Sequence, residues 1–148
     1  MSHPISQQNP FRDADHKPDW AQLTRLAGDR AAILFEELRE WIGAVDGLVE
    51  ELHYHGPEQG WLPRYRVGNQ ILFSAHVLPG LLEATLEVRT ALRQKVLASR
   101  RIAAGIKERV RSVPTDDDHA SIRVPLSSRA EVRAFVTLLV MKSQVAPE

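Results

Sequence analysis

The chain has 148 residues, of which 43% are hydrophobic and 26% charged, and it contains no cysteine. These values are typical of one globular domain, and they exclude a fibrous repeat, a wholly disordered chain and a disulfide framework. The formal net charge is zero, yet residues 1–60 hold eleven acids against five bases, whereas residues 89–111 hold eight bases against one acid.

The amino-terminal residues 1–18 contain three prolines and few large apolar side chains, and they predict a mobile tail. They lack the basic start and apolar core of a signal peptide, and the longest uncharged run, residues 67–82, is too short and too polar to span a membrane. With no cysteine present, we expect a cytoplasmic protein. The predicted domain covers residues 19–143, and residues 144–148 form a short tail.

Two helices are predicted at the start of the domain. Asp19 and Gln22 have the spacing of a capping box for a short first helix. Asp29 then caps a second helix, in which apolar residues recur every three or four positions as far as Val45. This spacing predicts an amphipathic helix that faces the core.

After Gly47 the hydrophobic period changes from 3.6 to 2, which indicates strands. Turn residues separate four extended segments, and Gly68-Asn69 has the composition of a two-residue hairpin loop. Four sequential strands with short turns predict an antiparallel meander. The expected strands are residues 48–55, 61–67, 70–78 and 81–89.

The rest of the chain predicts a helix, a strand and a second helix. Residues 90–112 are expected to form one long helix with a basic outer face, and residues 122–126 a fifth strand. Ser128 and Glu131 form a capping box for the last helix. The predicted fold class is α+β: a four- to five-strand antiparallel meander with helices on one face, in the order α-α-β-β-β-β-α-β-α.

Several short motifs follow one another in a particular order. They are Trp20 before the helices, Gly60-Trp61 and Tyr65-Arg66 at the first hairpin, and Leu138-Leu139 with Lys142 in the last helix. With this order the chain resembles the bacterial domain-of-unknown-function 3788 family over residues 19–142. The resemblance implies the fold. It implies no catalytic residues, because the family has no established activity.

Histidines and an acid alternate along the first strand and recur on the third. Glu51, His53 and His55 leave the same face of one strand, and His76 lies two strands further along. Imidazoles with a carboxylate can bind a divalent metal, so these four residues are a candidate metal site. The alternative is that they form the solvated side of the strand.

The second strand carries an aromatic pair beside a guanidinium. Trp61 and Tyr65 share a strand face and Arg66 is adjacent. Stacking and bidentate hydrogen bonds could hold a planar or anionic ligand here. The alternative is core packing of the aromatic residues plus a surface arginine.

The basic segment 89–111 could bind phosphates through charge alone. The candidate anion-binding residues are Arg93, Arg100, Arg101 and Lys107. Because the bases are not interleaved with aromatic residues and no nucleic-acid-binding motif is present, nucleic acid is not the expected partner. Pairing with the acidic half of the chain, in the same molecule or in another copy, is the alternative.

No nucleophile elbow or phosphate-binding glycine loop occurs in the sequence. We therefore predict a non-catalytic module that binds a small ligand or a protein partner and needs no cofactor; self-association into a homo-oligomer is one possibility. The alternatives are a small metal-dependent enzyme that uses the sheet histidines and an anion-binding protein that uses residues 89–111.

Overall fold

The structure is a computed structural model, and it describes residues 9–114 and 120–145. These residues form five helices and one five-stranded antiparallel sheet, whose strands lie side by side in the order of the sequence. The predicted α+β fold and element order are confirmed, with two helices in the place of the one predicted between the fourth and fifth strands. The elements are α1 (Trp20–Ala27), α2 (Asp29–Ile42), β1 (Leu48–Tyr54), β2 (Trp61–Val67), β3 (Gln70–Leu78), β4 (Leu81–Glu87), α3 (Thr90–Ala98), α4 (Ala104–Arg111), β5 (Ser121–Pro125) and α5 (Arg129–Gln144).

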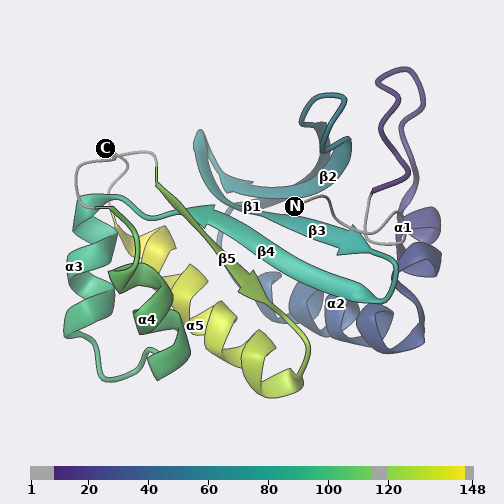
Figure 1. The fold of residues 1–148 in the computed structure, drawn as a ribbon. Helices are drawn as coiled ribbons and strands as arrows, with labels where there is room; N and C mark the ends of the chain where they lie inside the picture. Colours follow the sequence, from purple (N-terminus) through teal and green to yellow (C-terminus); the bar gives the residue numbers. More distant parts are fainter. Residues whose placement is uncertain (1–8, 115–119, 146–148) are drawn as a thin grey trace.

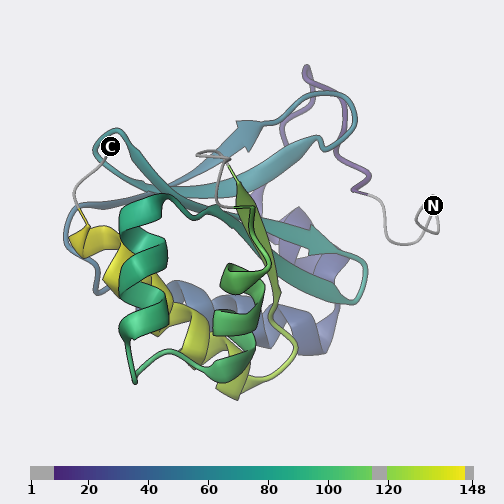
Figure 2. The same cartoon turned by 60° about the vertical axis from the view of Figure 1, so that its left-hand side comes forward.

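The domain has two layers, with the helices on one face of a twisted sheet (Figure 1, Figure 2). The core lies between the layers, where Phe35 of α2 and Phe135 of α5 are fully buried with Phe73 of β3. The Phe73 and Phe135 rings meet edge to face with centroids 5.0 Å apart. Burying each of these rings contributes roughly 2–3 kcal/mol. In the described residues no helix covers the other sheet face, and none could cross a membrane.

The basic segment forms two helices, so the prediction of one helix over residues 90–112 is wrong. The chain becomes extended at Ser99, and α4 begins after Ala103. The apolar stripe has a gap here, because the positions three and four residues after Val96 are Ser99 and Arg100. The break allows Val96 and Ile106 to be buried in the same core.

The described part of the predicted tail, residues 9–18, is packed against the domain. The Asn9 side-chain amide donates to the Gln59 and Trp61 carbonyls, each at 2.9 Å, and the Trp61 backbone N–H donates to the Phe11 carbonyl. Gly60 has φ +75°, and a Cβ there would lie 2.2 Å from the Phe11 oxygen. The packed region therefore begins at Asn9 rather than at Asp19. Residues 1–8 and 146–148 lie outside the described residues.

A β-bulge interrupts the pairing of β2 with β3. Tyr65 pairs with Phe73 and Arg66 with Ile71, so Leu72 is the extra residue, and both Leu72 and Phe73 are buried. The Leu72 carbonyl accepts a hydrogen bond from the Lys142 ammonium at 2.9 Å. A buried lysine of α5 thus supports the irregular point of the sheet.

Candidate functional site

The sheet face opposite the helices carries most of the chemically active side chains. Because side chains alternate along a strand, Phe73 and Ala75 point to the helices whereas Ser74 and His76 point the other way. We call this surface the histidine face. It comprises Glu51 and His53 of β1, His55 just after it, Arg64 and Arg66 of β2, Ser74 and His76 of β3, Glu83 and Thr85 of β4, and Arg123 of β5.

One row of side chains crosses the middle of the histidine face. Arg64 pairs with Ser74, Ser74 with Thr85, and Thr85 with Arg123, so the four residues are successive cross-strand neighbours. Neighbouring side chains in such a row are about 5 Å apart at Cβ. Two hydroxyl groups therefore lie side by side between two guanidinium side chains.

The Thr85 hydroxyl is the exceptional member of this row. Its Oγ1 is buried, and it has no hydrogen-bond partner among the residues that the structure describes. An unsatisfied buried hydroxyl costs about 1–3 kcal/mol. The Thr85 hydroxyl lies between Ser74 and Arg123, and because leaving it unsatisfied destabilises the protein, it is a candidate contact for a ligand.

His55 is held in place by the backbone and by Ser74. Its Nδ1 lies 3.0 Å from the His53 carbonyl and its Nε2 lies 3.4 Å from Ser74 Oγ. The carbonyl accepts only from N–H, so Nδ1 carries the proton and Nε2 is the acceptor. The 3.4 Å separation is long for O–H···N, and Ser74 lies inside a paired strand rather than on an exposed turn. This geometry favours hydrogen bonding to a ligand over nucleophilic catalysis.

The two histidines nearest the row both resist protonation. Burial lowers the pKa of His55, and the positive charge of Arg64 lowers it further. Burial also lowers the pKa of His76 to about 4, with further contributions from Arg123 and His55. Both imidazoles are therefore neutral near pH 7, and both lie in a positive electrostatic potential.

Acidification should destabilise the protein through His76. Its pKa is about 4 in the folded state against 6.5 in the unfolded chain, so the unfolded state binds more protons between these values. The free energy of unfolding should fall by roughly 2 kcal/mol from pH 6.5 to pH 4, after allowance for solvent screening. A His76→Gln variant should lose this part of the pH dependence in urea titrations. The same slope in both proteins would contradict the assignment.

The acids of the histidine face are paired with its arginines. Glu51 accepts one hydrogen bond from Arg64 at 2.9 Å and one from Arg66 at 3.1 Å, and Arg64 Nη2 forms an ion pair with it at 2.8 Å. The hydrogen bond from Arg64 is the main cause of the lowered pKa of Glu51. Arg123 Nε lies 3.5 Å from a Glu83 carboxylate oxygen. These pairs hold the guanidinium groups beside the hydroxyl row.

The predicted metal ligands share this face, but their arrangement does not support a metal site. The Glu51 carboxylate is already neutralised by the two arginines. His53 and His55 meet edge to face with ring centroids 4.8 Å apart. Across residues 9–114 and 120–145, no three histidine or acidic side chains are placed to hold a metal ion.

The predicted pocket residues Trp61, Tyr65 and Arg66 do not converge. Tyr65 is fully buried and stacks on Phe73 at 4.6 Å, so it is a core residue. The Trp61 indole N–H donates to the Asp13 carbonyl at 2.9 Å, beneath the amino-terminal segment. Arg66 lies on the opposite sheet face with Glu51. A shared ligand pocket does not form from these three side chains.

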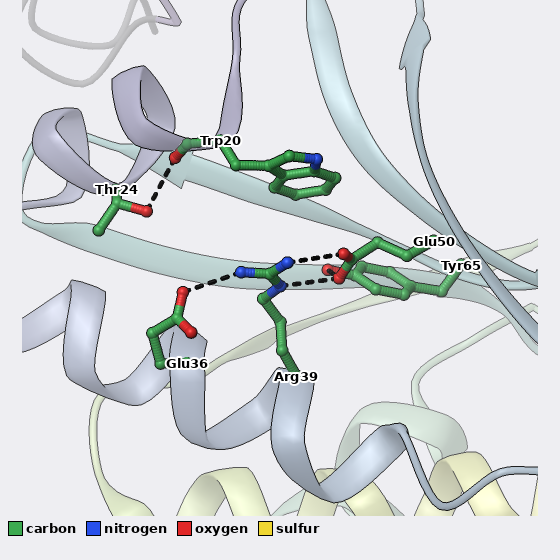
Figure 3. Close-up of polar contacts among 6 residues, drawn as sticks. All are labelled: Trp20, Thr24, Glu36, Arg39, Glu50 and Tyr65. Atoms are coloured by element: carbon green, nitrogen blue, oxygen red, sulfur yellow. Dashed lines mark hydrogen bonds and ion pairs between the residues drawn. The ribbon is translucent and has the colours of Figure 1, made fainter.

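Tyr65 belongs instead to a polar network that sequence reasoning missed (Figure 3). Glu50 accepts two hydrogen bonds from Arg39, each at 2.8 Å, and one from the Tyr65 hydroxyl at 2.9 Å. The Arg39 guanidinium also lies 4.7 Å from the Trp20 ring centroid, where its charge meets the face of the indole. The network connects α1, α2, β1 and β2, which is a structural role. The sequence held one signal of this network, because the acid Glu50 occupies a strand position that faces the core.

The candidate anion-binding residues are distributed over α3, the link after it and α4. Arg93 donates to the carbonyls of Val110 and Val113, both at 2.8 Å, and so stabilises the end of α4. Arg100 and Arg101 lie in the link between the helices and Lys107 lies in α4. A single helix would have aligned these basic residues, and the break at Ser99 places them on different elements.

Comparisons of this chain with protein-family models, with curated proteins and with solved structures find no match. The function must therefore be inferred from the geometry of the histidine face.

Proposed function

We propose that this protein is a non-catalytic binding module that holds a small organic or inorganic anion, a carboxylate or a phosphate, on the histidine face. The observation that carries the proposal is the buried Thr85 hydroxyl, which lies without a hydrogen-bond partner in the described structure, between Ser74 and Arg123. The side chains that cover it would have to move aside to admit a ligand oxygen, which would then accept its proton and remove the cost of leaving it unsatisfied.

The electrostatics of the face supports an anion over a cation. Burial is the main cause of the lowered pKa of both histidines, and the positive charges of Arg64 beside His55 and Arg123 beside His76 lower these pKa values further. Guanidinium groups also match the geometry of carboxylates and phosphates. The paired acids Glu51 and Glu83 reduce this field, which favours a ligand with one anionic group over a polyanion such as nucleic acid.

The resemblance to a bacterial family and the absence of cysteine favour the bacterial cytoplasm as the place of action.

The test is a titration of the protein with inorganic phosphate and with simple carboxylates, followed by calorimetry and by the imidazole NMR signals. We expect binding to raise the pKa of His76, because an anion stabilises the imidazolium form. Thr85→Val should weaken binding about tenfold or more, the value of one hydrogen bond to a charged group. It should also stabilise the free protein slightly, since an unsatisfied hydroxyl is removed.

The matched control is Thr137→Val on α5, where the hydroxyl donates to the Arg133 carbonyl, on the helix layer and far from this face. It should leave anion affinity unchanged. Unshifted imidazole signals throughout the titration, or equal losses in the two threonine variants, would refute the proposal.

A further inference from the structure

The outer surface of the helix layer carries exposed apolar side chains. Among the described residues, four large hydrophobic side chains are strongly exposed, and three of them, Ile33 (58%), Trp41 (47%) and Val140 (40%), belong to α2 and α5. These two helices pack together below the sheet (Figure 1). Exposed tryptophan is unusual on a surface that stays in water and is enriched where proteins associate.

This surface also has a shape that could receive another molecule. A groove of about 710 Å³ runs along α2 past Ile33 and Trp41, and Arg129 of α5 forms part of its wall. Arg129 is held by Glu37 at 3.0 Å, and the Arg133 guanidinium lies 5.8 Å from the Trp41 ring centroid. We call this surface the α2–α5 face: Ile33, Glu37, Trp41, Arg129, Arg133 and Val140.

The charges of the α2–α5 face are divided between its two helices. The groove side of α2 carries Glu36, Glu37 and Glu40, and α5 contributes Arg129 and Arg133 beside it. Within the chain Glu36 is paired with Arg39 and Glu37 with Arg129. A two-fold axis that runs along the line between α2 and α5 would set α2 of one copy against α5 of the other, and the acidic edge of each copy would then meet the basic edge of the other. The whole chain has no net charge, so no long-range repulsion opposes this approach.

We propose that the protein forms a two-fold symmetric homodimer through the α2–α5 face. Trp41 lies near the centre of the interface, and the α2 acids of each copy face the α5 arginines of the other while Glu36 and Glu37 keep their ion pairs with Arg39 and Arg129 of their own chain. The proposal is independent of the anion site, because the two surfaces lie on opposite layers of the domain (Figure 2).

Charge reversal tests the pairing directly by sedimentation velocity. One variant combines Glu36→Lys with Glu40→Lys, and a second combines Arg129→Glu with Arg133→Glu. We expect the wild type to dimerise with rising concentration and each variant to remain a monomer, because like charges then face one another. An equimolar mixture of the two variants should form a dimer, since each acidic edge again meets a basic one.

A matched pair of apolar substitutions tests the contribution of Trp41. Trp41→Ala should weaken dimerisation at least tenfold. Ile71→Ala removes a side chain that is 46% exposed on the other sheet face and should leave dimerisation unchanged. Thermal melts of every variant check that it is folded before its dimerisation is compared. Any one of three results would overturn the proposal: a wild type that is monomeric at all concentrations, a mixture of the charge variants that stays monomeric, or equal effects of the two alanine variants on dimerisation. Binding of a basic peptide to the same groove would not rescue it.

Discussion

Replacing Glu50 with alanine is expected to destabilise the protein by about 3 kcal/mol. The change removes the acceptor of two hydrogen bonds from Arg39 and one from Tyr65. Hydrogen bonds to charged groups contribute about 1.5–3 kcal/mol each, and a partly buried charge that loses its partner adds a penalty. The three bonds share one carboxylate, so their contributions do not simply add. Urea denaturation monitored by circular dichroism measures the loss.

Glu36→Ala is the matched control for this prediction. Glu36 bonds the same guanidinium at 2.9 Å, but its side chain is exposed, so removing it should cost less than 1 kcal/mol. The loss of stability in Tyr65→Phe should lie between those of the two alanine variants, because this change removes one hydroxyl and leaves the ion pair of Arg39 with Glu50 intact. A Glu50→Ala variant within 1 kcal/mol of the wild type would show that solvent satisfies Arg39.

The pH dependence of the same network has a definite sign. Burial alone would raise the pKa of Glu50, but the hydrogen bonds from Arg39 and Tyr65 outweigh it, and the net shift is downward. The stabilisation is therefore present above the unfolded value of 4.5 and is lost as the pH falls below it. Acid unfolding should begin at higher pH in Tyr65→Phe than in the wild type.

The fold could be predicted from the sequence because its signals are local. The alternation in β4 gave the buried residues Leu82, Ala84 and Leu86, and the capping box at Asp19 and the N-cap at Ser128 gave two helix starts. The apolar stripe of the basic segment has a gap after Val96, but the gap alone does not predict two helices, because the break depends on two short helices packing side by side around Arg93. Tertiary packing overrode helix propensity there.

The candidate site could be predicted only in part. Strand alternation correctly put Glu51, His53 and His55 on one face, since that needs no knowledge of pairing. The row of Arg64, Ser74, Thr85 and Arg123 depends on the register of four strands, which the bulge at Leu72 shifts by one residue. Thr85 could not be singled out in the sequence, because threonine is common in strands. Only the burial of its hydroxyl without a hydrogen-bond partner in the described structure makes it unusual.

Raising the pH from 7 to 10 is expected to stabilise the protein through Lys142. This side chain is only 7% exposed, and its Nζ donates to the carbonyls of Leu72 and Glu87 at 2.9 and 3.0 Å. Burial lowers the pKa of Lys142 to about 8, against 10.5 for the unfolded chain. Between these values the unfolded state binds more protons, so the free energy of unfolding should rise with pH, by about 2–3 kcal/mol up to pH 10.

The hydrogen bonds should survive this deprotonation. A neutral amine keeps two N–H donors, which is the number that the two carbonyls accept, so the bulge at Leu72 stays supported while the cost of burying the charge disappears. Lys142→Met should abolish the rise between pH 8 and pH 10, whereas Lys95→Met, which removes an exposed lysine of α3, should keep it. Since tyrosines of the unfolded chain ionise near pH 10, only the difference between the two variants isolates Lys142. If the free energy of unfolding rises equally with pH in both variants, burying the charge of Lys142 has no cost, and the charged ammonium itself holds the bulge.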